Sequence, residues 1–172
     1  MKSVFQEAGV SAEETVAVAE GEQVVFVSTA RWHQDNEHVL VVACPDPRFR
    51  EARGEFIDVR YGLRRYDPLI IPGGPQAVLH ETPNSALIRD MVSLLDTAHG
   101  FERIIGISHS DCRAYKEAYP DLTEQQRRVK QIDHLRAFIA EMERLVRNVA
   151  VEAFYSEPVD GRIRFVLVGP SS

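Results

Sequence analysis

Short runs rich in apolar residues recur along this chain and are separated by longer segments with helical spacing. An unbroken run such as Val39–Ala43 is typical of a strand that is buried on both faces of a sheet. The predicted strands are residues 24–27, 39–43, 69–71, 103–108 and 162–168. The predicted helices are residues 51–62 and 85–98, and the longest periodic segment is residues 122–154. This alternation predicts an α/β domain with a mainly parallel β-sheet flanked by helices.

Apolar positions repeat every three or four residues in two of the helical segments. In residues 85–98 they are Leu87, Met91, Leu94 and Leu95, and Gly100 provides a stop. In residues 122–154 they are Ile132, Leu135, Ile139, Met142, Val146 and Val149, with Phe138 and Leu145 widening the stripe. A stripe of this width is more typical of a helix that covers a sheet than of a free coiled coil.

The bulk composition narrows the classes of protein to consider. A chain of 172 residues, with 44% hydrophobic and 27% charged residues, is typical of one soluble domain with a sizeable core. A net charge of −6 without a long basic run argues against binding to nucleic acid. No apolar stretch approaches the roughly 20 residues of a membrane span, and the first residues lack the apolar core of a secretion signal. We therefore expect a cytoplasmic protein.

The two cysteines of the chain each lie near the end of a predicted strand. Cys44 follows residues 39–43, and Cys112 follows His109 by three residues after the strand at 103–108. In open α/β sheets, ligands bind outside the carboxyl ends of the strands. Zinc favours thiolate and imidazole ligands, and a catalytic zinc takes three from the protein and leaves a fourth position for water or substrate. The pattern predicts a zinc site made by Cys44, His109 and Cys112.

Asp46 and Arg48 follow Cys44 at alternate positions. Pro45 and Pro47 favour an extended path through this segment, because residues before proline avoid the helical region. Side chains at alternate positions of an extended segment share a face. We expect Arg48 to pair with Asp46, which keeps the carboxylate ionised and able to accept a hydrogen bond from zinc-activated water.

Other interpretations of these residues stay open. The cysteines could be small buried apolar residues, and His109 an ordinary hydrogen-bonded side chain. Two cysteines are too few for a disulfide framework, and a bond between them is disfavoured in a reducing compartment. The spacing of Cys44 and Arg50 also occurs in cysteine-dependent phosphatases, but Pro45 and Pro47 lack the backbone N–H groups which that loop needs.

Taken together, Cys44-x-Asp46-x-Arg48 and His109-x-x-Cys112 resemble the paired motifs of the β-class carbonic anhydrases. The resemblance implies that Cys44, His109 and Cys112 bind zinc and that Asp46 and Arg48 form the catalytic dyad. It also implies that activated water attacks carbon dioxide to give bicarbonate. Members of this family pair and share pocket walls, so it implies a homodimer or a higher homo-oligomer.

The resemblance covers roughly residues 36–170, and the chain departs from the family pattern around the expected pocket. Arg113 stands where the family usually has glycine, and a bulky cation there would close the pocket or bind an anion. The loop at residues 72–75, which contains Gly73 and Gly74, lacks the family's arginine and asparagine. It is either a plain turn or brings backbone N–H groups close to a ligand. Gln34 is the candidate for the family's pocket glutamine.

These departures leave two alternative functions open. One is a zinc-binding homologue without carbonic anhydrase activity that acts as a binding or assembly protein. The other is hydrolysis of another small electrophile, such as carbonyl sulfide or carbon disulfide. In either case we expect a single zinc-binding α/β domain at residues 36–172, preceded at residues 1–35 by an N-terminal arm or helix and a short strand.

Overall fold

The computed structural model describes residues 23–31, 33, 36–79 and 82–169. Contacts divide the chain into Met1–Asp35 and Asn36–Ser172, and each is described by itself. In the first unit, the predicted strand at residues 24–27 is wrong, because residues 23–31 contain neither helix nor strand. Val25 and Phe26 are 88% and 80% exposed, so the side chains of this apolar run lack the burial that favours a strand.

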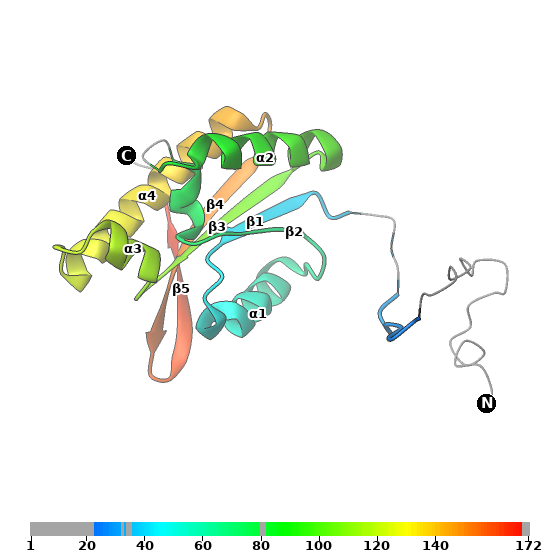
Figure 1. Ribbon diagram of the computed structural model, residues 1–172, viewed down its shortest axis with the longest axis horizontal. Coiled ribbons are helices and arrows are strands. Elements are labelled where there is room, and N and C mark those ends of the chain that lie inside the picture. The colour runs from blue at the N-terminus through cyan, green and yellow to red at the C-terminus, as the bar shows by residue number, and fades with distance from the viewer. Residues whose placement is uncertain (1–22, 32, 34–35, 80–81, 170–172) are drawn as a thin grey trace. The chain divides into compact units, whose positions relative to one another are not determined.

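The second unit is built on one five-stranded sheet (Figure 1). Its strands are β1 (Val39–Ala43), β2 (Asp67–Ile70), β3 (Arg103–His109), β4 (Ala150–Val159) and β5 (Arg162–Val168). The spatial order is β2-β1-β3-β4-β5, and only the β4–β5 pair is antiparallel. The predicted α/β class with a mainly parallel sheet is confirmed.

Helices cover both faces of this sheet (Figure 1). They are α1 (Arg50–Tyr61), α2 (Ser85–His99), α3 (Arg113–Ala118) and α4 (Glu124–Leu145), together with the 3-10 helices η2 (Pro47–Phe49) and η3 (Gly74–Val78). Alternate residues of β1 belong to different clusters: Val39 and Val41 pack with Ile57 of α1, and Leu40 and Val42 pack with α2 and α4. β1 is therefore buried on both faces, which is why its sequence is an unbroken apolar run.

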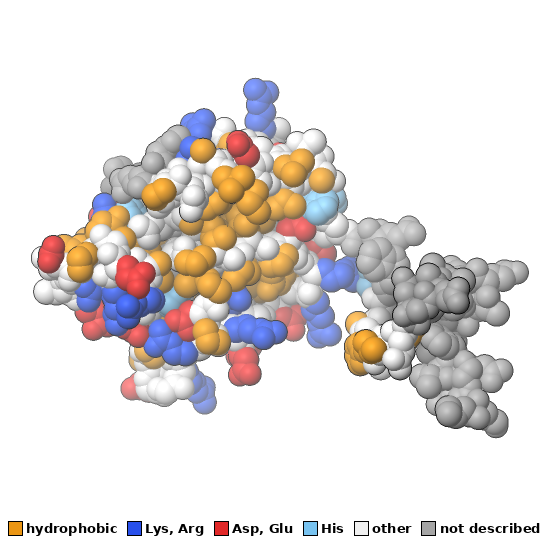
Figure 2. All heavy atoms as spheres, in the orientation of Figure 1, with side chains coloured by type: hydrophobic (Ala, Val, Ile, Leu, Met, Phe, Trp, Pro, Cys, Tyr) orange, Lys and Arg blue, Asp and Glu red, His pale blue; other side chains and the backbone are white. Residues whose placement is uncertain are grey.

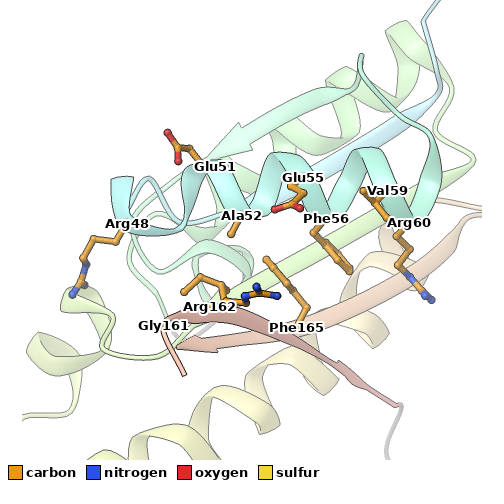
Figure 3. Close-up of a pocket in the computed structure, with 11 residues that line it drawn as sticks. Arg48, Glu51, Ala52, Glu55, Phe56, Val59, Arg60, Gly161, Arg162 and Phe165 are labelled. Carbon is orange, nitrogen blue, oxygen red and sulfur yellow. The ribbon is translucent and has the colours of Figure 1, made fainter. Parts of the chain in front are cut away.

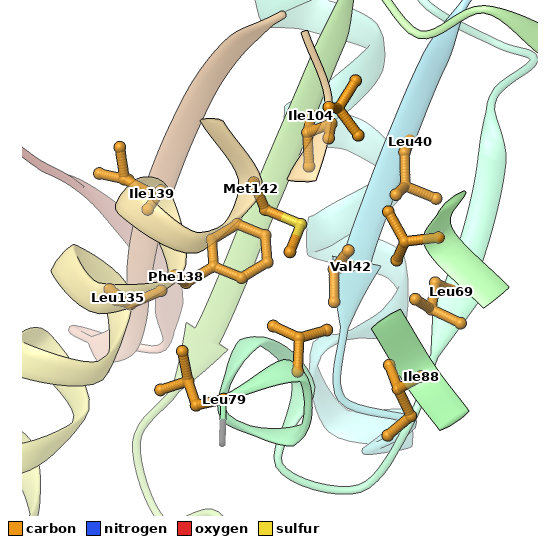
Figure 4. Packing of buried hydrophobic residues seen from close by; sticks show 14 of the residues in the cluster. Leu40, Val42, Leu69, Leu79, Ile88, Ile104, Leu135, Phe138, Ile139 and Met142 are labelled. Carbon is orange, nitrogen blue, oxygen red and sulfur yellow. The ribbon is translucent and has the colours of Figure 1, made fainter. Parts of the chain in front are cut away.

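The larger core cluster lies between β1, β3 and the two long helices (Figure 4). Phe138 and Met142 of α4 are fully buried there beside Leu40 and Val42 of β1. Gly106 of β3 makes room for the ring of Phe138, since a Cβ atom at this position would overlap the ring. The predicted role of the long apolar stripe, to cover a sheet, is confirmed by this packing.

Two elements differ from the pattern-based predictions. The segment 122–154 is not one periodic unit, because α4 ends at Leu145, the chain turns at Asn148 with a φ of 58°, and β4 begins at Ala150. In α2, the helix is present, but of the predicted stripe only Leu95 packs against the core, and Ile88 and Val92 are the buried residues beside it. The outward residues Leu87, Met91 and Leu94 are 63%, 41% and 69% exposed.

Figure 2 shows hydrophobic side chains gathered on the surface over the region of α2. Exposed apolar patches on a surface often mark a contact with another molecule.

Among the described residues, no helix is long and apolar enough to cross a membrane.

Candidate metal centre

The predicted zinc ligands meet at the carboxyl edge of the sheet. Cys44 follows β1, His109 is the last residue of β3, and Cys112 immediately precedes α3. Because β1 and β3 are parallel neighbours, their ends lie at the same edge. The Sγ atoms of the cysteines and a ring nitrogen of the histidine all lie within 4.8 Å of one another, and all three residues are buried.

The geometry of this cluster fits a tetrahedral zinc ion. With Zn–S bonds of about 2.3 Å, two thiolates lie roughly 3.8 Å apart, and the Sγ atoms of Cys44 and Cys112 are 3.9 Å apart. Nδ1 of His109 lies 2.7 Å from the carbonyl oxygen of Ser110, which can only accept, so Nδ1 carries the proton. Nε2 then holds a lone pair, and it is buried without a hydrogen-bond partner among the described residues. A buried nitrogen of this kind is costly unless it binds something.

The two thiols have unequal surroundings. A hydrogen bond from Cys112, and weaker ones from the backbone N–H groups of Asp46 and Gly73, lower the pKa of Cys44 against the opposing effect of burial. The hydrogen bond to Cys44 and burial raise the pKa of Cys112. A bound zinc ion would favour the thiolate form of both cysteines.

Asp46 and Arg48 form the predicted ion pair. Nε of Arg48 lies 3.0 Å from Oδ1 of Asp46, and Nη2 lies 2.7 Å from Oδ2, so the guanidinium binds both carboxylate oxygens. This hydrogen bonding lowers the pKa of Asp46. The expected extended path is wrong beyond Asp46, because Pro47–Phe49 form η2 and the Asp46 side chain caps it by accepting from the Arg48 N–H.

Asp111, which the sequence analysis did not single out, also binds Arg48. Its Oδ2 atom lies 2.8 Å from Nη1 of Arg48, and Lys116 contacts its other carboxylate oxygen. These two partners, with Lys116 the stronger, lower the pKa of Asp111 to about 2. Asp111 has a φ of 58°, a left-handed conformation that aspartate tolerates better than most residues. Arg48 thereby joins the two segments that carry the candidate ligands.

Gly73 and Gly74 lie against the metal cluster, and both have positive φ angles of 83° and 55°. A Cβ atom on Gly74 would lie 3.1 Å from the Cys44 nitrogen, 3.2 Å from the Ala43 carbon and 3.2 Å from the Ile107 oxygen. The loop therefore does more than reverse the chain: it brings Gly74 against the backbone beneath Cys44, and the Gly73 N–H reaches the Cys44 sulfur.

A pocket of about 430 Å³ opens beside Cys44. Its wall consists of Pro45, Asp46, Pro47, Arg48, Pro72, Arg113, Ala114 and Glu117. Nε of Arg113 lies 2.7 Å from Oε1 of Glu117, and the Arg113 side chain is 84% exposed. Arg113 is thus held at the rim by Glu117. Gln34 lies outside the described residues.

A larger hollow, of about 790 Å³, lies elsewhere, between α1 and β5 (Figure 3). Phe56 of α1 and Phe165 of β5 stack with ring centroids 4.3 Å apart and line it. Arg48 borders both hollows, but none of the three candidate ligands lines the larger one. The pocket beside Cys44, which Asp46 and Arg48 also line, is therefore the candidate active site.

A five-stranded, mainly parallel sheet with a Cys–His–Cys cluster at its carboxyl edge defines an α/β protein of the β-carbonic anhydrase fold. A family model described as "Putative carbonic anhydrase" matches residues 34–166, so the chain belongs to that family, as a divergent member. No curated protein matches the sequence.

Solved structures agree on the fold. A carbonic anhydrase from Streptococcus mutans is 19% identical and has a TM-score of 0.53, with 83% of this chain and 88% of that chain covered. A structure of tetrameric β-carbonic anhydrases from Sordaria macrospora is 11% identical and has a TM-score of 0.50, with 77% and 81% covered. At these identities the likeness concerns the fold alone.

Proposed function

We propose that this protein binds one zinc ion through Cys44, His109 and Cys112 and catalyses the reversible hydration of carbon dioxide to bicarbonate. The observation that carries the proposal is the buried cluster of three ligand atoms within 4.8 Å of one another, in a chain of a carbonic anhydrase family. When bound, zinc acts as a Lewis acid that makes a nucleophile available from water near neutral pH. The two thiolates formally balance the charge of the dication, which leaves the tuning of the reacting water to neighbouring polar groups.

In this proposal Asp46 and Arg48 orient the reacting water. Arg48 donates to both carboxylate oxygens, so Asp46 stays ionised and its direction is fixed. An ionised carboxylate can accept a hydrogen bond from water and hold it in a reactive direction. The wall formed by Pro45, Pro47 and Pro72 suits a small, uncharged substrate such as carbon dioxide.

The test is stopped-flow measurement of carbon dioxide hydration by zinc-loaded protein, from about pH 7 to pH 9, which brackets a zinc-activated water. We expect hydration well above the uncatalysed rate, and we expect Cys44→Ser to abolish it together with zinc binding. Protein that holds one zinc and shows no hydration at any pH in this range would contradict the proposed activity.

A second function is favoured by Arg113, which stands at the pocket rim in an ion pair with Glu117. If the Arg113 side chain blocks the pocket, the protein is a zinc-dependent binding or assembly protein without activity. Arg113→Gly then restores hydration to an inactive wild type, whereas Glu117→Gln, which leaves the arginine in place, is the matched control. The same preparations, assayed for sulfide release from carbonyl sulfide or carbon disulfide, test the third possibility of a different electrophile.

We further infer that the protein is a homodimer or a higher homo-oligomer. The exposed Leu87, Met91 and Leu94 of α2 support this inference, and the Sordaria macrospora relatives are described as tetrameric. Light scattering during size-exclusion chromatography tests it, and the mass of a single chain across a range of concentrations would contradict it. The expected cytoplasmic location stays a prediction that cell fractionation can test.

A further inference from the structure

The candidate ligands lie where strand pairing stops. β1 and β3 pair from Val39 to Ala43 and from Arg103 to Ile107, and the pairing of β3 with β4 ends at His109. A buried backbone carbonyl needs a hydrogen-bond partner, and beyond these points the neighbouring strand no longer supplies one. The carbonyl groups of the ligand residues must therefore find other donors.

Side chains from helices on opposite faces of the sheet supply two of these donors. Nε2 of Gln131, in α4, lies 2.7 Å from the carbonyl oxygen of His109. Nη1 of Arg53, in α1, lies 2.9 Å from the carbonyl oxygen of Cys44. For the third ligand residue, Cys112, the donor is the backbone N–H of Lys116 in α3.

Gln131 is unusual for its position in α4. It is 3% exposed, on a helix face whose other buried residues include Leu135, Phe138, Ile139 and Met142. A primary amide is costly to bury, so its hydrogen bond to the His109 carbonyl is the compensating interaction. One turn further along the same helix, Nδ1 of His134 lies 3.0 Å from the hydroxyl group of Tyr115, which clusters with both cysteines. The polar part of this buried face is thus directed at the segments that carry the ligands.

We propose that Gln131 and Arg53 are positioning residues of the metal centre, which fix the backbone of His109 and of Cys44 and thereby set the affinity for zinc. Neither residue contacts the ion, and each acts through the ligand residue that it holds. The inference rests on the proposed function, because it requires zinc at the Cys–His–Cys cluster. Partners that orient metal ligands typically contribute about 10- to 100-fold in metal affinity.

The experiment compares zinc affinity in two variants with a matched control. Gln131→Met removes the amide donor and keeps the length of the side chain. Arg53→Met removes the guanidinium donor in α1 and leaves a shorter, uncharged side chain. Zinc dissociation constants are measured by competition with a chromophoric chelator. We expect each variant to bind zinc about 10- to 100-fold more weakly than wild type. Cobalt(II) substitution gives a second readout, because a displaced ligand changes the thiolate-to-cobalt absorption band.

The control is Thr123→Ala, which removes the N-cap of α4 without touching the metal site. The Thr123 side chain accepts from the Gln126 N–H in a capping box, so its loss destabilises the helix that carries Gln131. We expect Thr123→Ala to lower the unfolding midpoint of the protein while its zinc affinity and cobalt spectrum stay those of wild type. If Gln131 only stabilises the helix, zinc affinity should fall together with the unfolding midpoint in both Gln131→Met and Thr123→Ala.

The outcomes separate this inference from the proposed function. Wild type that binds zinc, with Gln131→Met and Arg53→Met binding it equally tightly, overturns the inference alone. If Gln131→Met fails to fold, Arg53→Met decides the question from the other face of the sheet. Wild type that binds no zinc overturns the proposed function and the inference with it.

Discussion

Replacing Gly74 by alanine tests how closely the loop at residues 72–75 supports Cys44. A left-handed backbone costs an alanine about 1–2 kcal/mol relative to a residue without Cβ. The new Cβ atom would also lie 3.1–3.2 Å from backbone atoms of Cys44, Ala43 and Ile107. None of these is the mobile end of a side chain, so relief requires a shift of the strand ends, and overpacking of this kind costs about 1–3 kcal/mol. The expected total is about 2–5 kcal/mol of unfolding free energy.

Gly161→Ala is the matched control for this prediction. Gly161 also has a positive φ, of 74°, but a Cβ atom there would meet no heavy atom within 4 Å. Gly161→Ala should therefore lower the free energy of unfolding only by the cost of a left-handed alanine, about 1–2 kcal/mol. The difference between the two variants isolates the close approach of Gly74 to the backbone of Cys44.

The assay is urea-induced unfolding of both variants and wild type, followed by far-UV circular dichroism, together with zinc affinity by chelator competition. We expect Gly74→Ala to lose more stability than Gly161→Ala and to bind zinc more weakly, because the shift falls on the Cys44 backbone. Equal losses of stability in the two variants, with equal zinc affinity, would refute the reasoning.

Three further predictions concern the core, the pH dependence and the ion pair. Gly106→Ala should cost about 1–3 kcal/mol in urea unfolding, since its Cβ atom would overlap the Phe138 ring; an unchanged midpoint would contradict this. A hydrogen bond from Arg164 lowers the pKa of Glu157 in the folded protein. The ionised Glu157 therefore stabilises the fold above its unfolded-state pKa of about 4.3, and this contribution is lost as the pH falls through the folded-state pKa. Glu157→Gln should therefore lose less stability than wild type between about pH 5 and pH 3, and parallel losses would count against the pair. Asp46→Asn should keep its zinc but hydrate carbon dioxide about 10- to 100-fold more slowly, and an unchanged rate would remove Asp46 from the reaction.

The sequence predicted most of the sheet because a strand buried on both faces has a continuous apolar run with a clear end. Residues 39–43 became β1 at the predicted positions. Residues 162–168 became β5 at the predicted positions too, although β5 is a partly exposed edge strand. β4 was missed because Ala150–Val159 follow directly on a periodic helix, and their first apolar residues continue its spacing. The run at 24–27 resembles a strand equally well, but among the residues that the structure describes it pairs with no strand. Pairing depends on the rest of the chain, which a local pattern does not contain.

The buried face of α2 shows the same limit. The sequence offers one stripe through Leu87, Met91 and Leu94 and another through Ile88 and Val92, and both have helical spacing. Only packing against the sheet selects the second stripe as the buried one.

The candidate ligands could be predicted because each lies beside a strand end, so topology alone brings them to one edge. The residues that hold the candidate ligands and Arg48 in place could not be predicted from the sequence. Gln131 is 22 positions from His109, and Asp111 is 63 positions from Arg48. Their residue types are ordinary for an α-helix and for a turn, and nothing near them in sequence indicates their partners. Contacts of this kind follow from the packed fold.

The central claim is that Cys44, His109 and Cys112 together hold a zinc ion, and zinc content tests it most directly. The measurement is inductively coupled plasma mass spectrometry of protein purified under reducing conditions, with Cys44→Ser prepared in parallel. Wild type is expected to contain one zinc ion per chain, and the variant almost none. Wild type without zinc, or a variant that retains as much zinc as wild type, would contradict the claim.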